Sequence, residues 1–295
     1  MHAVRQQQEL AGLTGLAPGD HVCYVIGSED EFEAAAQRCL AEGLAAGQKL
    51  FRFLPAAATD RHAAGNGLPI TFADPARDFL NDGPLVPEVM LSMFAEQTSI
   101  ARREGYTGIR LVADMDWMLA HPPTPEQVAA FELVLDKAVA ELGVTVVCAY
   151  RPGSFGLGVT EAAAVHPQHA GSGHPPPLFR MWYVDDDAWQ ISGQVDLAAI
   201  VAFERALQTA AAAGPVRTVG CAGLAFISAA GIAALSRLAD TPAPHPMLIQ
   251  DASGIVRRCW QVLGLHELQP YVKFGDSTSR HAAGDARPAG HGDAA

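Results

Sequence analysis

Short apolar runs alternate with amphipathic helical stretches over residues 1–160, and this alternation constrains the fold more than any other feature. The runs predicted to be strands are His21–Ile26, Lys49–Leu54, Gly108–Ala113 and Val144–Tyr150. The helical stretches between them begin after Ser28, near Val86 and after Thr124. Strands that alternate with helices in this way form parallel sheets covered by helices, because each crossover packs on a face of the sheet. We therefore predict an α/β architecture with a parallel sheet for this half of the chain.

Two of these helices carry capping sequences at their beginnings. Ser28 stands three residues before Glu31. Thr124 likewise stands three residues before Gln127. In such capping boxes the two side chains satisfy each other's backbone N–H groups. A glycine at the far end favours a helix stop, so the second helix is predicted to end at Gly143.

Parallel sheets bind ligands in the crevice beyond the carboxyl ends of their strands. The polar or aromatic residues that follow three of the predicted strands are Gly27-Ser28, Asp114-Met115-Asp116-Trp117 and Tyr150-Arg151. These ends converge only if the three strands are neighbours. Adjacent strands would therefore bring a candidate pocket together at this edge.

His21 and Cys23 lie two residues apart on a predicted strand, so their side chains face the same side. Joined by Tyr24 or Asp114, they suit a ligand-sensing or soft-metal pair, or a Cys–His nucleophilic dyad. The alternative is that Cys23 packs in the core while His21 hydrogen-bonds to nearby backbone. The sequence identifies no third residue to orient a dyad, which favours the packing alternative.

Asp114 and Asp116 also lie two residues apart and resemble paired carboxylates. The alternative is that one caps a helix and the other is solvated. Trp117 either covers a pocket or packs against the core. Both interpretations stay open for these three residues.

The motifs GDHVCY at residues 19–24, the acidic helix start at 28–32, DMDW at 114–117 and CAY at 148–150 resemble the MEDS domain. This sensory domain of methanogens and methylotrophs also occurs in regulators of dichloromethane metabolism. The resemblance covers about residues 10–168 and implies a sensory role and a fold similar to RecA-like ATPases. It departs at Arg151, where the family often has an acidic residue. The candidate sensory pocket comprises His21, Cys23, Tyr24, Asp114, Asp116, Trp117 and Tyr150.

A RecA-like fold invites a search for nucleotide-binding residues. A phosphate-binding loop needs glycines and a Gly-Lys-Ser/Thr triad, which cradle phosphates with backbone N–H groups and a lysine. The first predicted strand is instead followed by the acidic sequence GSEDE at residues 27–31, and no such triad occurs elsewhere. ATP hydrolysis is therefore not predicted, and neither an enzyme activity nor a cofactor or bound metal is expected. The rival hypothesis is an enzyme, or a redox or metal sensor, that uses His21 and Cys23.

Residues 159–180 are rich in Gly, Pro, Ser and His and are predicted to be a linker between domains 1–158 and 181–275. The linker holds His166, His169 and His174, which resemble a metal cluster. In a segment rich in Gly and Pro, nothing would fix three histidines, so a flexible linker is favoured. The tail at 276–295 lacks periodicity and is predicted to be disordered.

The sequences WQISGQVDL at residues 189–197 and LAFISAAGIAAL at 224–235 resemble the STAS domain of anti-sigma factor antagonists. Each is a strand that leads into a helix start. The resemblance covers about residues 181–275 and implies a docking module for an anti-sigma factor or a serine kinase-like protein. The residues that would form the docking surface are Asp196, Ser228, Ala229, Ala230 and Gly231.

The chain departs from the STAS pattern at the position that a partner kinase would phosphorylate, which is Ala229. Alanine has no oxygen to receive a phosphoryl group. Ser228 stands one residue early, and a shift of one residue at a strand end points the side chain to the other face. We therefore expect no phosphorylation switch, and expect the first half of the chain to control the docking surface.

The charge and hydropathy of the chain exclude other classes of protein. The net charge of −12 argues against binding to nucleic-acid backbones. No apolar stretch approaches the length of a membrane span, and Met1–Leu10 is too polar for a secretion signal. The five widely spaced cysteines include no Cys-x-x-Cys pair, which excludes a disulfide framework or zinc knuckle. The sequence thus predicts a cytoplasmic signalling regulator with two α/β domains, or a scaffold of a stress-signalling assembly that senses no ligand.

Overall fold

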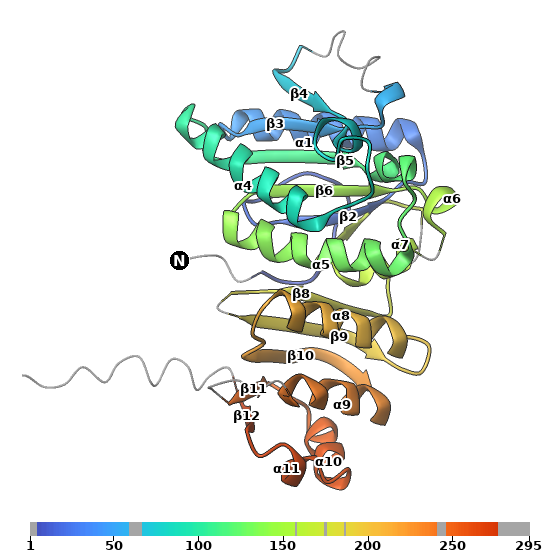
Figure 1. Ribbon diagram of the computed structural model, residues 1–295, viewed down its shortest axis with the longest axis vertical. Coiled ribbons are helices and arrows are strands. Elements are labelled where there is room, and N and C mark those ends of the chain that lie inside the picture. The colour runs from blue at the N-terminus through green and yellow to red at the C-terminus, as the bar shows by residue number, and fades with distance from the viewer. Residues whose placement is uncertain are drawn as a thin grey trace, which may run out of the picture.

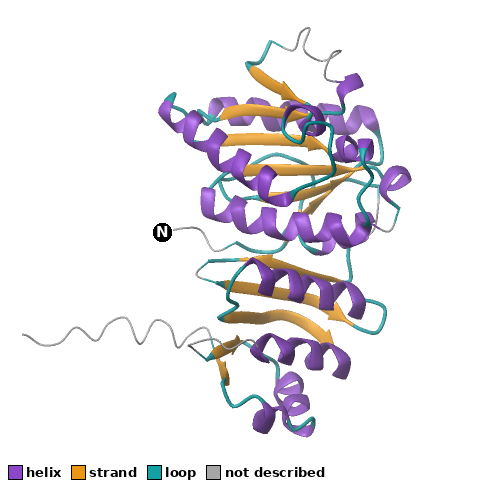
Figure 2. Ribbon diagram, in the orientation of Figure 1, coloured by secondary structure: helices purple, strands orange, loops and turns teal. Residues whose placement is uncertain are grey.

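Two β-sheets lie one above the other along the length of the molecule, each with helices packed against it (Figures 1 and 2). The computed structural model describes residues 5–58, 67–156, 158–173, 176–185, 187–240 and 246–276. In the described part of the chain, none of the helices has the length and apolar character that a bilayer crossing requires.

The first sheet has seven strands, and every neighbouring pair is parallel. In spatial order the strands are β1 (Gln8–Glu9), β7 (Gln168–Ala170), β2 (His21–Val25), β6 (Thr145–Tyr150), β5 (Ile109–Asp114), β3 (Lys49–Phe53) and β4 (Ile70–Ala73). The helices are α1 (Glu29–Ala45), α3 (Pro75–Asp78), α4 (Pro87–Arg103), η1 (Met115–Ala120), α5 (Pro125–Leu142), α6 (Pro152–Phe155) and α7 (Gly158–Ala164). Helix α1 packs on one face, whereas α4, α5 and α7 pack on the other. The prediction of a parallel, helix-covered sheet is confirmed.

The second sheet has five strands in a mixed arrangement. In spatial order they are β12 (Val272–Gly275), β11 (Met247–Gln250), β10 (Thr218–Ile227), β9 (Ala188–Val195) and β8 (Phe179–Tyr183), of which only β8 is antiparallel to its neighbour. The helices are α8 (Ile200–Ala213), α9 (Ala229–Ser236), η2 (Arg237–Asp240), α10 (Gly254–Val262) and α11 (Leu265–Leu268). The prediction of a second α/β unit is confirmed. The sequence predicted a strand at 216–220 and another in the apolar run from Leu224, which the structure joins into the single strand β10; it missed β12.

The capping residues act largely as predicted. The Thr124 hydroxyl accepts from the Gln127 N–H, and the Gln127 side chain accepts from the Thr124 N–H. Helix α5 ends at Gly143, whose left-handed backbone (φ 61°) favours glycine. The Ser28 hydroxyl likewise caps α1 by accepting from the Glu31 N–H. These caps fix where α5 and α1 begin over the sheet.

The prediction of a linker at 159–180 is wrong for its first twelve residues. Residues 158–164 form α7, and residues 168–170 form β7, which pairs between β1 and β2 inside the first sheet. The apolar side chains of Val159, Ala162 and Ala163 pack in the core, and this contribution outweighs the Gly/Pro composition that begins at Gly171. His166 and His169 are consequently buried rather than solvated. His174 and the tail beyond Asp276 lie outside the described residues.

The hydrophobic core of the second sheet includes side chains from the first half. Leu133 of α5, together with Ala164 and Val165 at the end of α7, belongs to the same cluster of buried side chains as β8 and β9. Helix α5 therefore lies between the sheets and packs on both halves (Figure 1).

The position of Gly171 provides a test of whether these residues belong to the first domain. Its φ of +89° disfavours any side chain, and a Cβ there would collide with the Val25 carbonyl. We expect Gly171→Ala to lower the free energy of unfolding by at least about 2 kcal/mol, from backbone strain and steric overlap. Urea denaturation measures the loss. The matched control Gly153→Ala adds a Cβ that meets nothing within 4 Å. Equal stabilities of the two variants would contradict the packed arrangement.

Candidate functional site

Four side chains from separate elements meet on the face of the first sheet that α5 covers. His21 is the first residue of β2, Cys148 lies on the adjacent strand β6, Glu132 lies on α5, and His166 lies between α7 and β7. Alternation along the strands turns His21 and Cys148 toward the face that α5 covers. All four side chains are buried.

The donor atoms of this cluster face one another at short range. His21 Nε2 lies 3.3 Å from Glu132 Oε2 and 3.5 Å from Cys148 Sγ. His166 Nε2 lies 3.4 Å from the same Glu132 oxygen. One donor atom from each of the four side chains lies within 4.8 Å of all the others. This proximity makes the four side chains candidate ligands for a bound ion.

Outer contacts hold three of these four side chains in place. His21 Nδ1 lies 3.2 Å from Asp136 Oδ1, and His166 Nδ1 lies 2.7 Å from the Ala162 carbonyl oxygen. The Tyr150 hydroxyl donates to the other oxygen of Glu132. Contacts of this kind fix the orientation of an imidazole ring and select which nitrogen faces inward.

Burial and neighbouring charges set the ionisation of the cluster. Burial alone would raise the pKa of Glu132, but His166 and His21 hold it far below its usual range. Burial opposes the positive charge of His21, yet Asp136 and Glu132 raise its pKa. Burial and the charge of His21 lower the pKa of His166. Burial also raises the pKa of the Cys148 thiol. Glu132 is therefore anionic, and Cys148 keeps its proton.

Asp136 connects the cluster to the second half of the molecule. Its carboxylate contacts His21, accepts from the Tyr183 backbone N–H of β8 at 2.8 Å, and pairs with the Arg5 guanidinium at 3.0 Å. Arg5 also donates to the Tyr183 carbonyl oxygen. Arg5 and His21 outweigh burial and lower the pKa of Asp136 to about 2. One buried carboxylate thus joins β2, β8 and the N-terminal segment.

The structure separates the predicted sensory residues. Tyr150 joins His21 in the cluster through Glu132. Cys23 is buried on the same face but lies outside the group of four, and burial raises its thiol pKa far above the usual range. A Cys23–His21 nucleophilic dyad is therefore not supported, because a protonated thiol is a poor nucleophile. Tyr24 lies on the opposite face of the sheet, against Phe32.

Asp114 and Asp116 belong to a second site, at the carboxyl edge of the sheet. Arg151 contacts Asp114 at 2.6 Å and Asp116 at 2.9 Å, and donates to Glu29 at 2.7 Å. Strands β2, β6 and β5 are neighbours, so the predicted convergence of these strand ends is confirmed. Asp114 also caps η1, as the alternative interpretation proposed. Trp117 is buried in the core.

The sequence missed Glu132, Asp136 and Cys148 and assigned His166 to a linker. A signal for the two acidic residues exists, since they lie four residues apart beside Phe131, Leu135 and Val139, all buried on α5. Carboxylates on the apolar face of a helix are rare unless they are paired. Their position therefore indicated buried partners.

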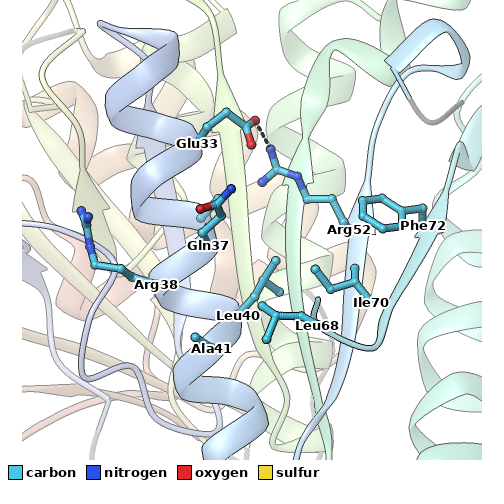
Figure 3. A pocket seen from close by; sticks show the side chains of 10 residues that line it. Glu33, Gln37, Arg38, Leu40, Ala41, Arg52, Leu68, Ile70 and Phe72 are labelled. Carbon is cyan, nitrogen blue, oxygen red and sulfur yellow. Dashed lines mark hydrogen bonds and ion pairs between the residues drawn. The ribbon is translucent and has the colours of Figure 1, made fainter. Parts of the chain in front are cut away.

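A shallow groove of about 560 Å³ lies on the opposite face of the sheet (Figure 3). Helix α1 forms one side of it, and β3, β4 and Leu68 form the other. Arg52 is buried at its edge, where one guanidinium nitrogen donates to Glu33 and another, Nη1, has no partner among the described residues. With the apolar side chains of Leu40 and Ile70 alongside, the groove suits a ligand with an apolar body and an acceptor group.

Comparison with protein families matches the first half of the chain to one family. The family model described as the methanogen/methylotroph, DcmR sensory domain (MEDS) matches residues 20–167. The match covers 148 of the 295 residues and includes all four members of the cluster, with Asp136 and Tyr150. No curated protein matches the chain.

We expect the substitution Asp136→Ala to lower the free energy of unfolding by about 3–5 kcal/mol, because it removes the buried carboxylate that pairs with Arg5 and His21 and accepts from the Tyr183 N–H. Chemical denaturation of the full chain measures the effect. The control Glu104→Ala breaks an exposed ion pair with Lys49 and should cost less than about 1 kcal/mol. A loss for Asp136→Ala as small as the control's would show that this carboxylate is not structurally important.

Proposed function

The chain belongs to the MEDS family, and on that premise we propose that it is a signalling regulator in which a sensory half controls a docking half. Membership in a sensory family indicates a signalling or regulatory role. The finer proposal is that the first half senses a signal at the cluster of His21, Glu132, Cys148 and His166. The second half then presents a docking surface of the STAS type to an anti-sigma factor or serine kinase-like partner.

The observation that carries the proposal is the double contact of Asp136. This carboxylate touches His21 on one side and the backbone of Tyr183 on the other. A change in charge or ligation at His21 alters the hydrogen bonds available to Asp136, and with them the anchoring of β8. Since the surrounding core is shared by both halves, such a change has a direct physical route to the second sheet.

Features of the second half support a docking role. Val195 and Ile227 end neighbouring parallel strands, so Asp196 and Ser228 follow at the same edge of the sheet. The exposed apolar side chains beside them are Leu197 and Phe226. Such exposed apolar groups are typical of protein-binding surfaces. Gly231 is a correction to the predicted surface, because it is buried against Ile227 and Val195 and packs α9.

The start of α9 favours control without phosphorylation. Ala229 and Ala230 are exposed in the first turn and carry no hydroxyl. The Ser228 hydroxyl caps the helix by accepting from the Gly231 N–H at 3.2 Å. We therefore propose that the sensory half, rather than a kinase, changes the affinity of this surface.

The rival functions have less support. An enzyme needs substrate to reach its reacting groups, whereas His21, Cys23 and Cys148 are buried, and both thiols have raised pKa values. We propose that the chain is not an enzyme. Burying a carboxylate, a thiol and two imidazoles costs free energy of folding. A scaffold that senses no ligand does not require such a buried polar cluster.

The docking surface is tested by capturing partners from host lysate with the full chain. We expect the wild type to retain an anti-sigma factor or serine kinase-like protein, and the double variant Leu197→Glu/Phe226→Glu to retain at least tenfold less. Charges placed there cannot be buried in an apolar interface. The control is Tyr271→Glu, an exposed side chain before β12, at the other edge of the sheet. Equal capture by all three chains would contradict the assigned surface.

The sensory control is tested in the same assay with His166→Ala. We expect this change to alter capture of the partner at least threefold, because it disturbs the cluster while leaving the docking residues in place. The control is His121→Ala, which removes an exposed imidazole from the same half. Capture that is indifferent to both substitutions would contradict the proposed coupling.

A further inference from the structure

We propose that His21, Glu132, Cys148 and His166 form a site for a divalent transition-metal cation, for which Zn²⁺ is the best fit. The inference rests on the proposed sensory function and deepens it by naming the class of ligand at that site. It goes against the sequence-based expectation of no bound metal. It depends on the positions of the donor atoms, on their unmet valence and on their chemical type.

Three of the six distances between the donor atoms match those of a tetrahedral zinc site. Zinc binds nitrogen, oxygen and sulfur at about 2.0–2.3 Å, which places neighbouring ligand atoms about 3.3–3.7 Å apart. The separations of 3.3, 3.4 and 3.5 Å between these side chains fall in that range. The other pairs of donor atoms lie within 4.8 Å, so side-chain movements of about an ångström would bring all four atoms to the ligand distances of one cation.

Two of the inward-facing atoms have unmet valence. Glu132 Oε2 and His166 Nε2 are buried and make no well-formed hydrogen bond in the described part of the chain. The nearest polar atoms to Glu132 Oε2 are His21 Nε2 at 3.3 Å and His166 Nε2 at 3.4 Å. His166 Nδ1 must carry a proton, because it lies 2.7 Å from the Ala162 carbonyl oxygen. Nε2 is then the ring nitrogen that faces the carboxylate oxygen of Glu132. A divalent cation between these two atoms would bond to both.

The surrounding contacts are those of metal-binding histidines and carboxylates. Imidazole ligands of metals typically donate their second N–H to a carboxylate or a backbone carbonyl. His21 has Asp136 in that position, and His166 has the Ala162 carbonyl. The Tyr150 hydroxyl occupies the outer oxygen of Glu132 and leaves the inner one free. These three ligands are thus already turned inward.

The donor set selects the class of metal. Two imidazoles, a thiolate and a carboxylate suit zinc and neighbouring transition metals, whereas Ca²⁺ and Mg²⁺ prefer six or more oxygens. On binding, Cys148 loses its thiol proton and His21 loses its imidazolium proton, and both protons go to solvent. One Zn²⁺ with one thiolate and one carboxylate is then neutral, which suits a buried site. Four protein ligands leave no open position for substrate, so the site suits sensing or stabilisation rather than catalysis.

The experiment uses Co²⁺ as a spectroscopic substitute for Zn²⁺ in the full chain, after a chelator has removed metals. We expect one Co²⁺ per chain, with the thiolate-to-cobalt charge-transfer band and the intense visible bands of a tetrahedral site, all displaced by Zn²⁺. Cys148→Ala should lose the charge-transfer band and bind Co²⁺ more than about 100-fold more weakly. Cys23→Ala is the matched control, since this buried cysteine pairs in register with Cys148 but lies outside the group of four.

Three outcomes would overturn the metal site. They are no saturable binding to the wild type, the weak spectrum of six-coordinate Co²⁺, and equal loss of the charge-transfer band in both cysteine variants. If Cys148→Ala does not fold, as judged by circular dichroism, the wild-type spectrum alone decides. Partner capture separates this inference from the sensory function. If the chain binds metal but partner capture does not change with Zn²⁺, chelator or His166→Ala, the sensory function is refuted and the metal site is not. If capture changes with His166→Ala but the chain binds no metal, the metal site is refuted and the sensory function is not.

Discussion

The buried carboxylate of Asp136 is the contact on which both halves of the molecule depend. An isolated carboxylate in this position would be very costly, and it is tolerated because Arg5, His21 and the Tyr183 N–H surround it. Each partner comes from a different part of the chain: the N-terminal segment, the first sheet and the second sheet. The arrangement therefore connects segments that are distant in sequence and places a buried charge where the two halves meet. A change in the protonation or ligation of His21 would affect the contacts of Asp136 first.

Helix α5 explains why the contacts of Asp136 and the cluster of four side chains lie together. Glu132 and Asp136 are one turn apart on α5, so they face the same side, and Leu133 next to them enters the core of the second half. The helix is fixed at its beginning by Thr124 and at its end by Gly143. A rigid helix with both ends capped keeps the two carboxylates in register with β2 and β8. One helix thus positions Glu132 of the cluster, positions Asp136, and packs on both halves.

The sequence predicted the sheet of the first half and singled out His21 as a candidate site residue, but it did not predict the cluster. Alternating strands and helices are local patterns, and they identified β2, β3, β5 and β6 directly. Glu132 was not predicted as a site residue, because a carboxylate on a helix is ordinarily solvated. Only its position among buried neighbours distinguishes it. His166 was assigned to a linker for a different reason, because glycines and prolines follow it. In the structure, β7 pairs between β1 and β2 and holds this segment in place. Partners more than a hundred residues apart, such as His21 and Cys148, cannot be paired from local pattern alone.

The carboxyl edge of the first sheet shows why the candidate site lies elsewhere. Parallel α/β sheets usually bind their ligands beyond this edge. Here Arg151 fills the edge by pairing with Asp114, Asp116 and Glu29, so its positive charge is already neutralised by the protein's own carboxylates. Glu29 and Asp114 raise the pKa of Arg151, as mutually stabilised charges do. A phosphate group arriving there would have to displace three carboxylates. The carboxyl edge of this sheet is therefore occupied by an ion cluster of Arg151 with three carboxylates, and the buried cluster of titratable groups lies on the face of the sheet that α5 covers.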